Sequence, residues 1–112
     1  MGFTLRDIHC HILPGVDDGA PDLAGSLQML EAAKTAGVTS IVCTPHCRDP
    51  YFDYDAMWNA FHELQEHADG FPLQMGFEVA HPKLIELGVE EWAPYLCFDG
   101  SNEFLLELDP HA

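Results

Sequence analysis

Apolar runs and helical patterns alternate along the chain, and this alternation restricts the possible folds more than any other feature of the sequence. Apolar residues spaced three and four apart predict two long helices, over 22–36 and 54–68. The β-branched and apolar runs around them predict four strands and one short helix: 5–9, 38–44, 73–79 and 103–108 for the strands, and 82–87 for the helix. Strands that alternate with helices favour parallel pairing through right-handed crossovers. We therefore expect an α/β fold, either a layered sheet or a barrel.

The size and composition of the chain indicate one small domain with a modest core. The chain has 112 residues, of which 47% are hydrophobic and 11% are aromatic. Nineteen acidic and four basic side chains give a formal net charge of −15 at pH 7, and this charge would repel nucleic acid phosphates and an anionic membrane surface. No long apolar run and no leader-like amino terminus is present. We therefore expect a soluble, cytoplasmic protein that neither binds nucleic acid nor inserts into a membrane.

The cysteines do not follow a disulfide pattern: they are Cys10, Cys43, Cys47 and Cys97. Three of them lie in or beside apolar runs, so we interpret them as reduced residues of the core. A tyrosine phosphatase of the cysteine type needs an arginine six residues after its thiolate. None of Cys10, Cys43 and Cys47 has an arginine at that position, so the cysteine-type mechanism is excluded there.

Side chains that bind metals gather at the predicted carboxyl ends of the strands. In "DIHCHILPGVDDG" (7–19), His9 and His11 lie at the end of the first strand, and their spacing points both rings to one face. Further acidic and imidazole groups end the other strands or lie in the loop after the first one: Asp17, Asp18, His46, Glu78 and Glu107. In parallel α/β folds, functional residues collect at this end of the sheet. We therefore expect these groups to meet.

Imidazole and carboxylate ligands without a thiolate favour a catalytic site for zinc, manganese or iron. A structural zinc site built from His9, Cys43, His46 and Cys47 is the alternative, but it leaves Cys43 inside a strand and the carboxylates without a role. The remaining histidines are interpreted as ordinary surface or core residues: His62, His67, His81 and His111.

The motifs "DIHCHILPGVDDG", "TPH" and "GFE", in this order and spacing, resemble the opening motifs of the polymerase-and-histidinol-phosphatase (PHP) superfamily. More narrowly, they resemble the bacterial PHP-type protein tyrosine phosphatases encoded with capsular and exopolysaccharide biosynthesis genes. The "PGVDDG" extension points to this branch. The resemblance implies a distorted barrel of seven β/α units with up to three divalent metal ions (Mn, Fe or Zn). It also implies hydrolysis of phosphotyrosine by a metal-activated water, on a protein substrate such as a bacterial tyrosine kinase.

The resemblance assigns roles to individual residues. His9 and His11 would bind one metal ion, and Glu78 would bridge it to a second ion that Glu107 also holds. Asp18 and His46 would hold the third ion. Asp17 would shape the loop, with a ligand role as its alternative. Arg48 would contact a substrate phosphate, and no catalytic residue is implied beyond the metal ligands.

The resemblance covers only part of the family domain. A seven-unit barrel needs roughly twice this length, so residues 1–112 are expected to be the amino-terminal half of a PHP phosphatase domain, about four of its units. In the family, the carboxyl half supplies a further histidine, an Asp-x-His pair and arginines. We interpret the terminal Asp109, Pro110 and His111 as a coincidental match to that pair. A homo-oligomer could complete the open barrel.

Two other functions remain open on the sequence alone. One is a small-molecule PHP phosphoesterase such as a histidinol phosphatase. The other is a catalytically incomplete half-domain that binds metal without turnover. Metal binding is common to all three functions, so hydrolysis and its substrate must discriminate among them.

Overall fold

All strand pairs in the computed structural model, which describes residues 4–108, are parallel. The elements in this range follow one another as β1 (Arg6–Cys10), α1 (Leu23–Thr35), β2 (Ser40–Cys43), β3 (His46–Cys47), α2 (Tyr54–His67), β4 (Leu73–Met75), β5 (Glu78–Ala80), α3 (His81–Leu87), α4 (Val89–Leu96) and β6 (Leu105–Glu107). The predicted α/β class with parallel strands is therefore confirmed. Asp109, Pro110 and His111 lie outside the described residues.

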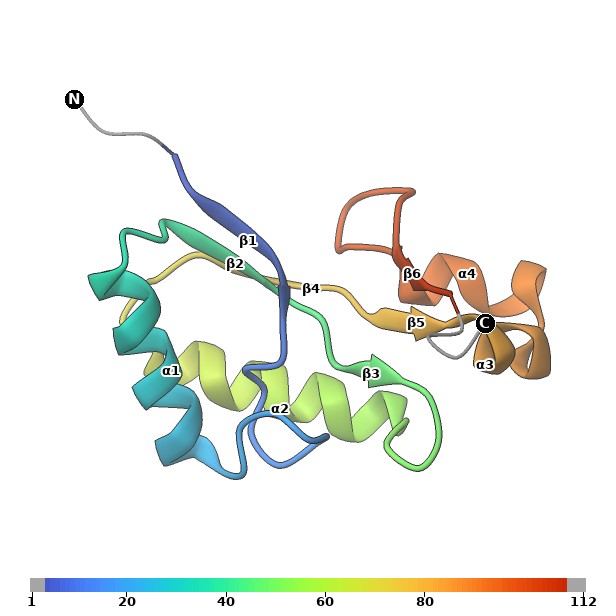
Figure 1. Cartoon of the computed structure of the whole chain (residues 1–112), viewed down its shortest axis with the longest axis horizontal. Helices are drawn as coiled ribbons and strands as arrows, with labels where there is room; N and C mark the ends of the chain where they lie inside the picture. Colours follow the sequence, from blue (N-terminus) through green and yellow to red (C-terminus); the bar gives the residue numbers. More distant parts are fainter. Residues whose placement is uncertain (1–3, 109–112) are drawn as a thin grey trace.

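The structure contains two three-stranded sheets, in the orders β1–β2–β4 and β3–β5–β6 (Figure 1). They are joined because β2 continues into β3 and β4 continues into β5. Cys43 pairs with Met75 in the first sheet. His46 pairs with Glu78 in the second sheet, three residues further along each of the two segments. Hydrogen bonds from Gly76 N to Cys43 O (2.8 Å) and from Glu78 N to Pro45 O (3.0 Å) bridge the break. The four chain segments β1, β2–β3, β4–β5 and β6 therefore lie in sequence order.

The predicted strands over 38–44 and 73–79 were wrong in extent: the first is shorter, as β2, and the second is divided into β4 and β5. Pro45 has no N–H to donate, so it separates β2 from β3. Gly76 separates β4 from β5, and a Cβ at this position would collide with the Phe98 ring. The breaks therefore mark a proline and a site of close packing.

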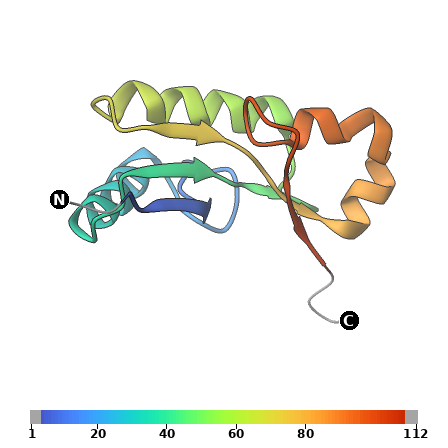
Figure 2. The ribbon, with the colours of Figure 1, turned by 90° about the horizontal axis from the view of Figure 1, so that it is seen from above.

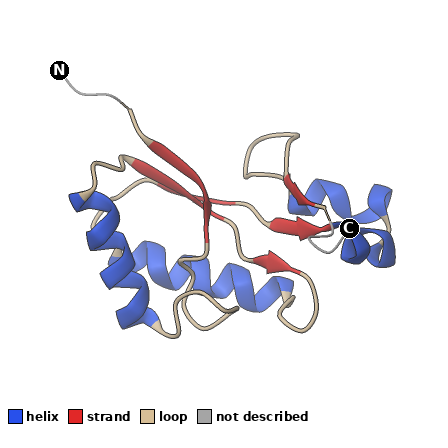
Figure 3. Ribbon diagram, viewed as in Figure 1, coloured by secondary structure: helices blue, strands red, loops and turns tan. Residues whose placement is uncertain are grey.

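The two long helices begin at aspartate caps. The side chain of Asp22 accepts a hydrogen bond from Gly25 N (2.8 Å) at the start of α1, and Asp53 accepts one from Ala56 N (3.1 Å) at the start of α2. Both helices lie on the same side of the first sheet (Figures 1 and 3). The buried residues between these layers include Ile41, Met57, Phe61, Leu64 and Met75. This core leaves the other side of the strands to the candidate site.

The helices α3 and α4 lie beside β5 and β6 (Figure 2). The helix α4 was not predicted, because Pro94 lies inside it and a proline argues against a helix interior. None of the helices within residues 4–108 has the length and apolar character needed to span a membrane. The four cysteines carry free thiols, as predicted.

Candidate metal centre

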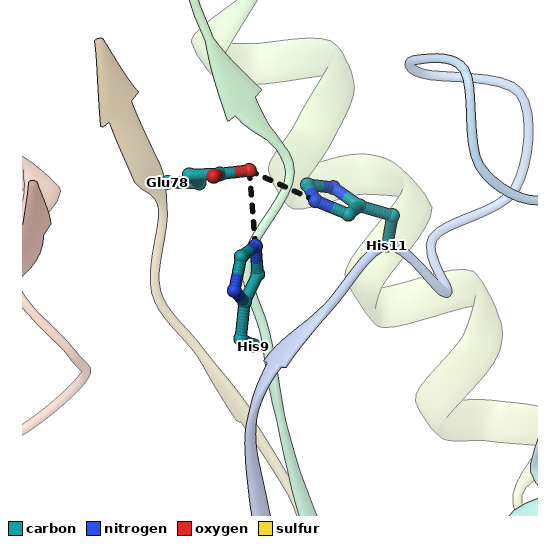
Figure 4. Close-up of side chains that lie close together, drawn as sticks. All are labelled: His9, His11 and Glu78. Atoms are coloured by element: carbon teal, nitrogen blue, oxygen red, sulfur yellow. Dashed lines mark ion pairs between the residues drawn. The ribbon is translucent and has the colours of Figure 1, made fainter. Parts of the chain in front are cut away.

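The candidate site begins at an irregularity in β1. Asp7 pairs with Ile41 and Cys10 pairs with Cys43, so β1 contains one more residue than β2 between these pairs. An extra residue of this kind redirects the side chains that follow it. Cys10 packs against the core beside Cys43. The flanking imidazoles of His9 and His11 both point toward Glu78 (Figure 4).

The carboxylate of Glu78 lies at the centre of three imidazoles. Its Oε1 is 3.2 Å from His9 Nε2 and 2.9 Å from His11 Nε2 (Figure 4). The same oxygen lies 3.2 Å from His46 Nδ1, on the register partner of Glu78. The side chain of Glu78 is 5% exposed, while that of His9 is 50% exposed. The cluster is therefore buried on the Glu78 side and open to solvent at His9.

The loop after β1 folds back onto the strand through Asp17. One Asp17 oxygen accepts a hydrogen bond from Gly19 N (2.9 Å), and the other accepts one from His46 N (3.0 Å) and contacts His11 Nδ1 (3.1 Å). Gly19 lies so close to His11 that a Cβ would overlap the His11 carbonyl oxygen. Asp17 therefore orients one imidazole and the backbone of another, which agrees with the predicted loop-shaping role.

These contacts change the acidity of both partners. Burial alone would raise the pKa of the Asp17 carboxyl, but the hydrogen bonds from His11, Gly19 N and His46 N outweigh it, and the pKa lies below its ordinary value. The hydrogen bond to Asp17 is the main reason that the pKa of His11 lies above its ordinary value, against the opposing effect of burial. Asp17 is thus a charged acceptor for the outer nitrogen of His11, an arrangement common for metal-binding histidines.

The remaining predicted ligands extend the cluster on its far side. Asp18 Oδ1 lies 3.2 Å from His46 Nε2, and Asp18 Oδ2 lies 4.0 Å from Arg48 Nη2. Ligand atoms of His46, Glu78 and Glu107 lie within 4.8 Å of one another. Ligand atoms also lie within 4.8 Å of one another in two further groups: His9, His11 and Glu78, and His11, Asp17 and His46. The structure therefore brings all six predicted ligands together, with Asp18 in contact with His46 alone among the other predicted ligands.

The thiols are separate from this cluster. The residues Cys43 and Cys47 are fully buried in the apolar core. Burial raises the pKa of Cys47 to about 12 and also raises the pKa of Cys43, so both thiols are protonated at neutral pH. No group of three metal-ligand residues found within residues 4–108 contains a cysteine. The structural zinc alternative is therefore wrong.

The donor set fits divalent transition metals. Glu78 Oε1 and His46 Nδ1 are both buried and have no hydrogen-bond partner among the described residues. Three imidazole nitrogens lie 2.9–3.2 Å from Glu78 Oε1 without forming a hydrogen bond to it. A buried carboxylate oxygen that accepts no hydrogen bond is costly, and a cation held between the carboxylate and the imidazoles would offset that cost. Mixed imidazole and carboxylate ligands suit zinc, manganese and iron. The unpaired atoms and the ligand chemistry thus agree.

Two residues near the site were missed by reasoning from the sequence. The ring of Tyr51 stacks on that of His46, with centroids 5.8 Å apart, and Arg48 lies 5.7 Å from the Tyr51 ring centroid. Thr44, within "TPH", is fully buried and contacts the backbone of Cys10. The position of Tyr51, five residues after His46, could have indicated that it lies near the site. The contact of Thr44 with Cys10 joins segments far apart in sequence, so no local pattern indicates it.

The other histidines lie away from these groups. His67 Nδ1 contacts the carbonyl oxygen of Glu63 on its own helix, and His62 packs edge-on against Phe61. His81 is exposed at the start of α3. His111 lies outside the described residues. The predicted ordinary roles of His62, His67 and His81 agree with these positions.

A family model described as "Capsular polysaccharide synthesis, CpsB/CapC" matches residues 5–112. The chain belongs to this family. The resemblance to the capsular branch of the PHP proteins is thus confirmed, since a match over nearly the whole chain does not depend on short motifs alone.

Similar proteins include two curated relatives. "Tyrosine-protein phosphatase YwqE" from Bacillus subtilis (strain 168) is 58% identical over 40 residues, which cover 36% of this chain and 16% of the relative. "Putative tyrosine-protein phosphatase CapC" from Staphylococcus aureus is 48% identical over 40 residues, with the same coverage. The matched segments therefore represent a small part of each relative.

A solved structure is similar over most of the chain. It is described as "Crystal structures of YwqE from Bacillus subtilis and CpsB from Streptococcus pneumoniae, unique metal-dependent tyrosine phosphatases". The TM-score is 0.71 at 27% sequence identity, and the match covers 94% of this chain and 44% of that chain. The present chain thus spans less than half the length of this structural relative.

Proposed function

We propose that this chain supplies the metal-binding, amino-terminal part of a metal-dependent protein tyrosine phosphatase of capsular and exopolysaccharide synthesis. The observation that carries the proposal is the position of Glu78 Oε1, buried and within 3.2 Å of nitrogens of His9, His11 and His46. The names of the relatives support the reaction, since both curated ones are called tyrosine-protein phosphatases.

The residues around Glu78 would hold up to three ions of manganese, iron or zinc. Such ions lower the pKa of a bound water and neutralise the charge of a phosphate ester. His9, His11 and Glu78 would hold the first ion, and Glu107 would share a second with Glu78. Asp18 and His46, whose side chains are 3.2 Å apart, would hold a third. The proximity of these ligand atoms supports the assignment.

Arg48 would bind the substrate phosphate beside the third ion. Its guanidinium lies over Tyr51 and 4.0 Å from Asp18, so it brings positive charge to the edge of an acidic cluster. The proposed substrate is a phosphotyrosine side chain of a protein, such as a bacterial tyrosine kinase. A planar guanidinium is well suited to the oxygens of such a phosphate.

The domain to which the chain contributes would be a seven-unit PHP barrel, and residues 1–112 would form its amino-terminal half. The order of four parallel segments supports this assignment, as does the 44% coverage of the structural relative. The remaining units would come from further chain or from a second copy that pairs with the open edges.

The alternatives receive less support. None of the relatives' names mentions histidinol phosphate or another small-molecule substrate, so a small-molecule phosphoesterase is not favoured. A metal-binding half-domain without turnover is an outcome that the test must distinguish.

The test measures metal content and hydrolysis in the same preparation. Metal-free protein is loaded with Mn²⁺ and assayed with a phosphotyrosine peptide and with histidinol phosphate. We expect hydrolysis of the peptide, and Glu78→Gln should reduce it by more than the roughly 10- to 100-fold that loss of a ligand-orienting partner costs. The matched control is Glu86→Gln, at a largely exposed position on α3.

Three results would contradict the proposal in different ways. Preference for histidinol phosphate would favour the small-molecule enzyme. Metal binding without hydrolysis of either substrate would favour the half-domain. Equal activity in Glu78→Gln and Glu86→Gln would show that the cluster around Glu78 is not the catalytic centre.

A further inference from the structure

A buried threonine lies beside the bulge of β1. The side chain of Thr44 is fully buried, and its Oγ1 accepts a hydrogen bond from Cys10 N (2.8 Å). The same hydroxyl lies within donating distance of Cys10 O (3.4 Å), and Thr44 N donates to that oxygen (2.9 Å). Thr44 therefore contacts both polar groups of Cys10 where the register between β1 and β2 shifts.

Cys10 is the residue between the two imidazoles that face Glu78. Its backbone sets the directions in which His9 and His11 leave the strand, and the bulge weakens the regular ladder that would otherwise hold it. Thr44 also precedes His46 by two residues, so it ties the segment that carries His46 to the strand that carries the histidine pair. One hydroxyl thus joins both histidine-bearing segments.

We propose that Thr44 is a positioning residue of the metal centre, whose hydroxyl holds Cys10 so that His9 and His11 face Glu78. Asp17 orients the ring of His11 from outside, and Thr44 orients the backbone from within the sheet. The effect is on metal affinity, because imidazole ligands displaced by a fraction of an ångström bind less tightly.

The same strand pair provides a matched control at its other end. Thr39 Oγ1 accepts from Leu5 N (3.1 Å) and donates to Leu5 O (3.1 Å), and these partners are also 34 residues apart. Thr39 N donates to Leu5 O (2.8 Å), as Thr44 N does to Cys10 O. Thr39 is exposed and lies at the amino end of the strands, away from the histidines. Its substitution removes the same type of contact without touching the centre.

The experiment compares Thr44→Val, Thr44→Ser and Thr39→Val in the full chain. Each protein is stripped of metal and titrated with Zn²⁺ by calorimetry and with Co²⁺ by visible absorption, whose intensity reports ligand number and geometry. We expect Thr44→Val to lower the affinity for the most tightly bound Zn²⁺ ion roughly 10- to 100-fold and to change the Co²⁺ absorption spectrum. Thr44→Ser, which keeps the hydroxyl, and Thr39→Val should stay within about threefold of the unmodified protein.

Several results would overturn the inference. Unchanged affinity in Thr44→Val, an equal loss in Thr44→Ser, or an equal loss in Thr39→Val would each show that the hydroxyl does not act on the centre. If Thr44→Val does not fold, hydrogen exchange of the Cys10 amide in the unmodified protein replaces it. We expect slow exchange that metal slows further, and rapid exchange would refute the role.

The inference rests on the metal centre of the proposed function and not on its phosphatase activity. A protein that binds metal without hydrolysing phosphotyrosine contradicts the function and leaves this test intact. A protein whose Thr44→Val form binds metal normally contradicts only the inference. Failure of the unmodified protein to bind metal would overturn both.

Discussion

The buried carboxylate of Glu78 lowers the stability of the protein when no metal is bound. The residue is only 4% exposed, and its Oε1 has no hydrogen-bond partner among the described residues. A buried carboxylate that accepts no hydrogen bond destabilises a protein, even where imidazole nitrogens lie close to it as they do here. Sites that bind a cation commonly keep such groups, because the ion restores the missing interaction. At this residue, stability without metal and affinity for metal are therefore in conflict.

The conflict predicts opposite effects of Glu78→Gln with and without metal. In chelator, we expect the variant to unfold with a free energy higher by about 1 to 3 kcal/mol, because the buried charge is removed. With saturating Zn²⁺ the order should reverse. Urea denaturation measures both values, with Glu86→Gln as the exposed control. A variant less stable than the unmodified protein in chelator would refute the explanation.

The buried thiols should be chemically inert in the folded protein. Burial raises the pKa of Cys47 to about 12, so this thiol is protonated at pH 8. We expect iodoacetamide at pH 8 to modify the partly exposed Cys97 first and to leave Cys43 and Cys47 unmodified until urea unfolds the chain. Mass spectrometry of labelled peptides measures the rates, and Cys97→Ser should remove the fast reaction. Rapid native labelling of Cys47 would contradict the burial.

At the scale of elements, the loop between β1 and α1 is held against the strand by close backbone approach. Ala20 N donates to His11 O (3.2 Å), and Gly15 N donates to Ala20 O (2.9 Å). Gly19 lies against His11 with no space for a side chain. This approach brings Asp17 to His11 and Asp18 to His46, so the loop and the centre form together.

Gly19→Ala should therefore weaken metal binding more than its effect on folding explains. The added methyl group overlaps the carbonyl of His11, and either the loop or the strand must move. We expect at least about a tenfold loss of Zn²⁺ affinity by calorimetry. The control is Leu64→Val on α2, a buried truncation that costs on the order of 1 kcal/mol of stability. Equal losses of affinity in the two variants would contradict a local effect.

The elements that sequence patterns predicted well are those with local signals. The helices α1 and α2 differ from prediction by one residue at most at each end, because Asp22 and Asp53 cap them and Gly37 and Gly70 follow them. A break at Gly76 divided the predicted strand over 73–79, and α4 was missed because Pro94 lies inside it. The packing of Gly76 against Phe98 joins segments distant in sequence, which a local pattern does not contain.

The clustering of the candidate ligands was predictable for a related reason. Strand ends follow from local patterns, and parallel strands bring their carboxyl ends together. Three features were not predictable: the bulge of β1, the hydrogen bond from Cys10 N to Thr44 Oγ1, and the stacking of Tyr51 on His46. Each arises from packing between segments rather than from composition within one segment.

At the scale of the whole molecule, acidic composition and phosphate chemistry are reconciled by bound cations. The chain has a formal net charge of −15, and carboxylates of Asp17, Asp18, Glu78 and Glu107 lie at the candidate centre. Without cations, this field would repel a phosphate ester. The proposed divalent ions invert the local charge, so metal loading would control substrate access as well as reactivity.

The outer strands of the combined sheets expose apolar surface. In the strand order of the described chain, β1 lies at one end and β6 at the other. Ile8 on β1 is 49% exposed, and Leu106 on β6 is 41% exposed. Unpaired strand edges with exposed apolar side chains are sites of association. A second copy of the chain is one partner that could cover them.

We predict that the isolated chain self-associates through these two edges. Sedimentation equilibrium at increasing concentration should give a mass above that of the monomer, and Ile8→Lys or Leu106→Lys should shift it to the monomer, because a charge on an edge strand opposes pairing. Ile85→Lys is the matched control, since Ile85 is 60% exposed but lies on α3. A monomer at all concentrations, or equal dissociation by Ile85→Lys, would show that the edges do not drive association. Dissociation by the edge variants alone would identify β1 and β6 as the surfaces at which the proposed barrel is completed.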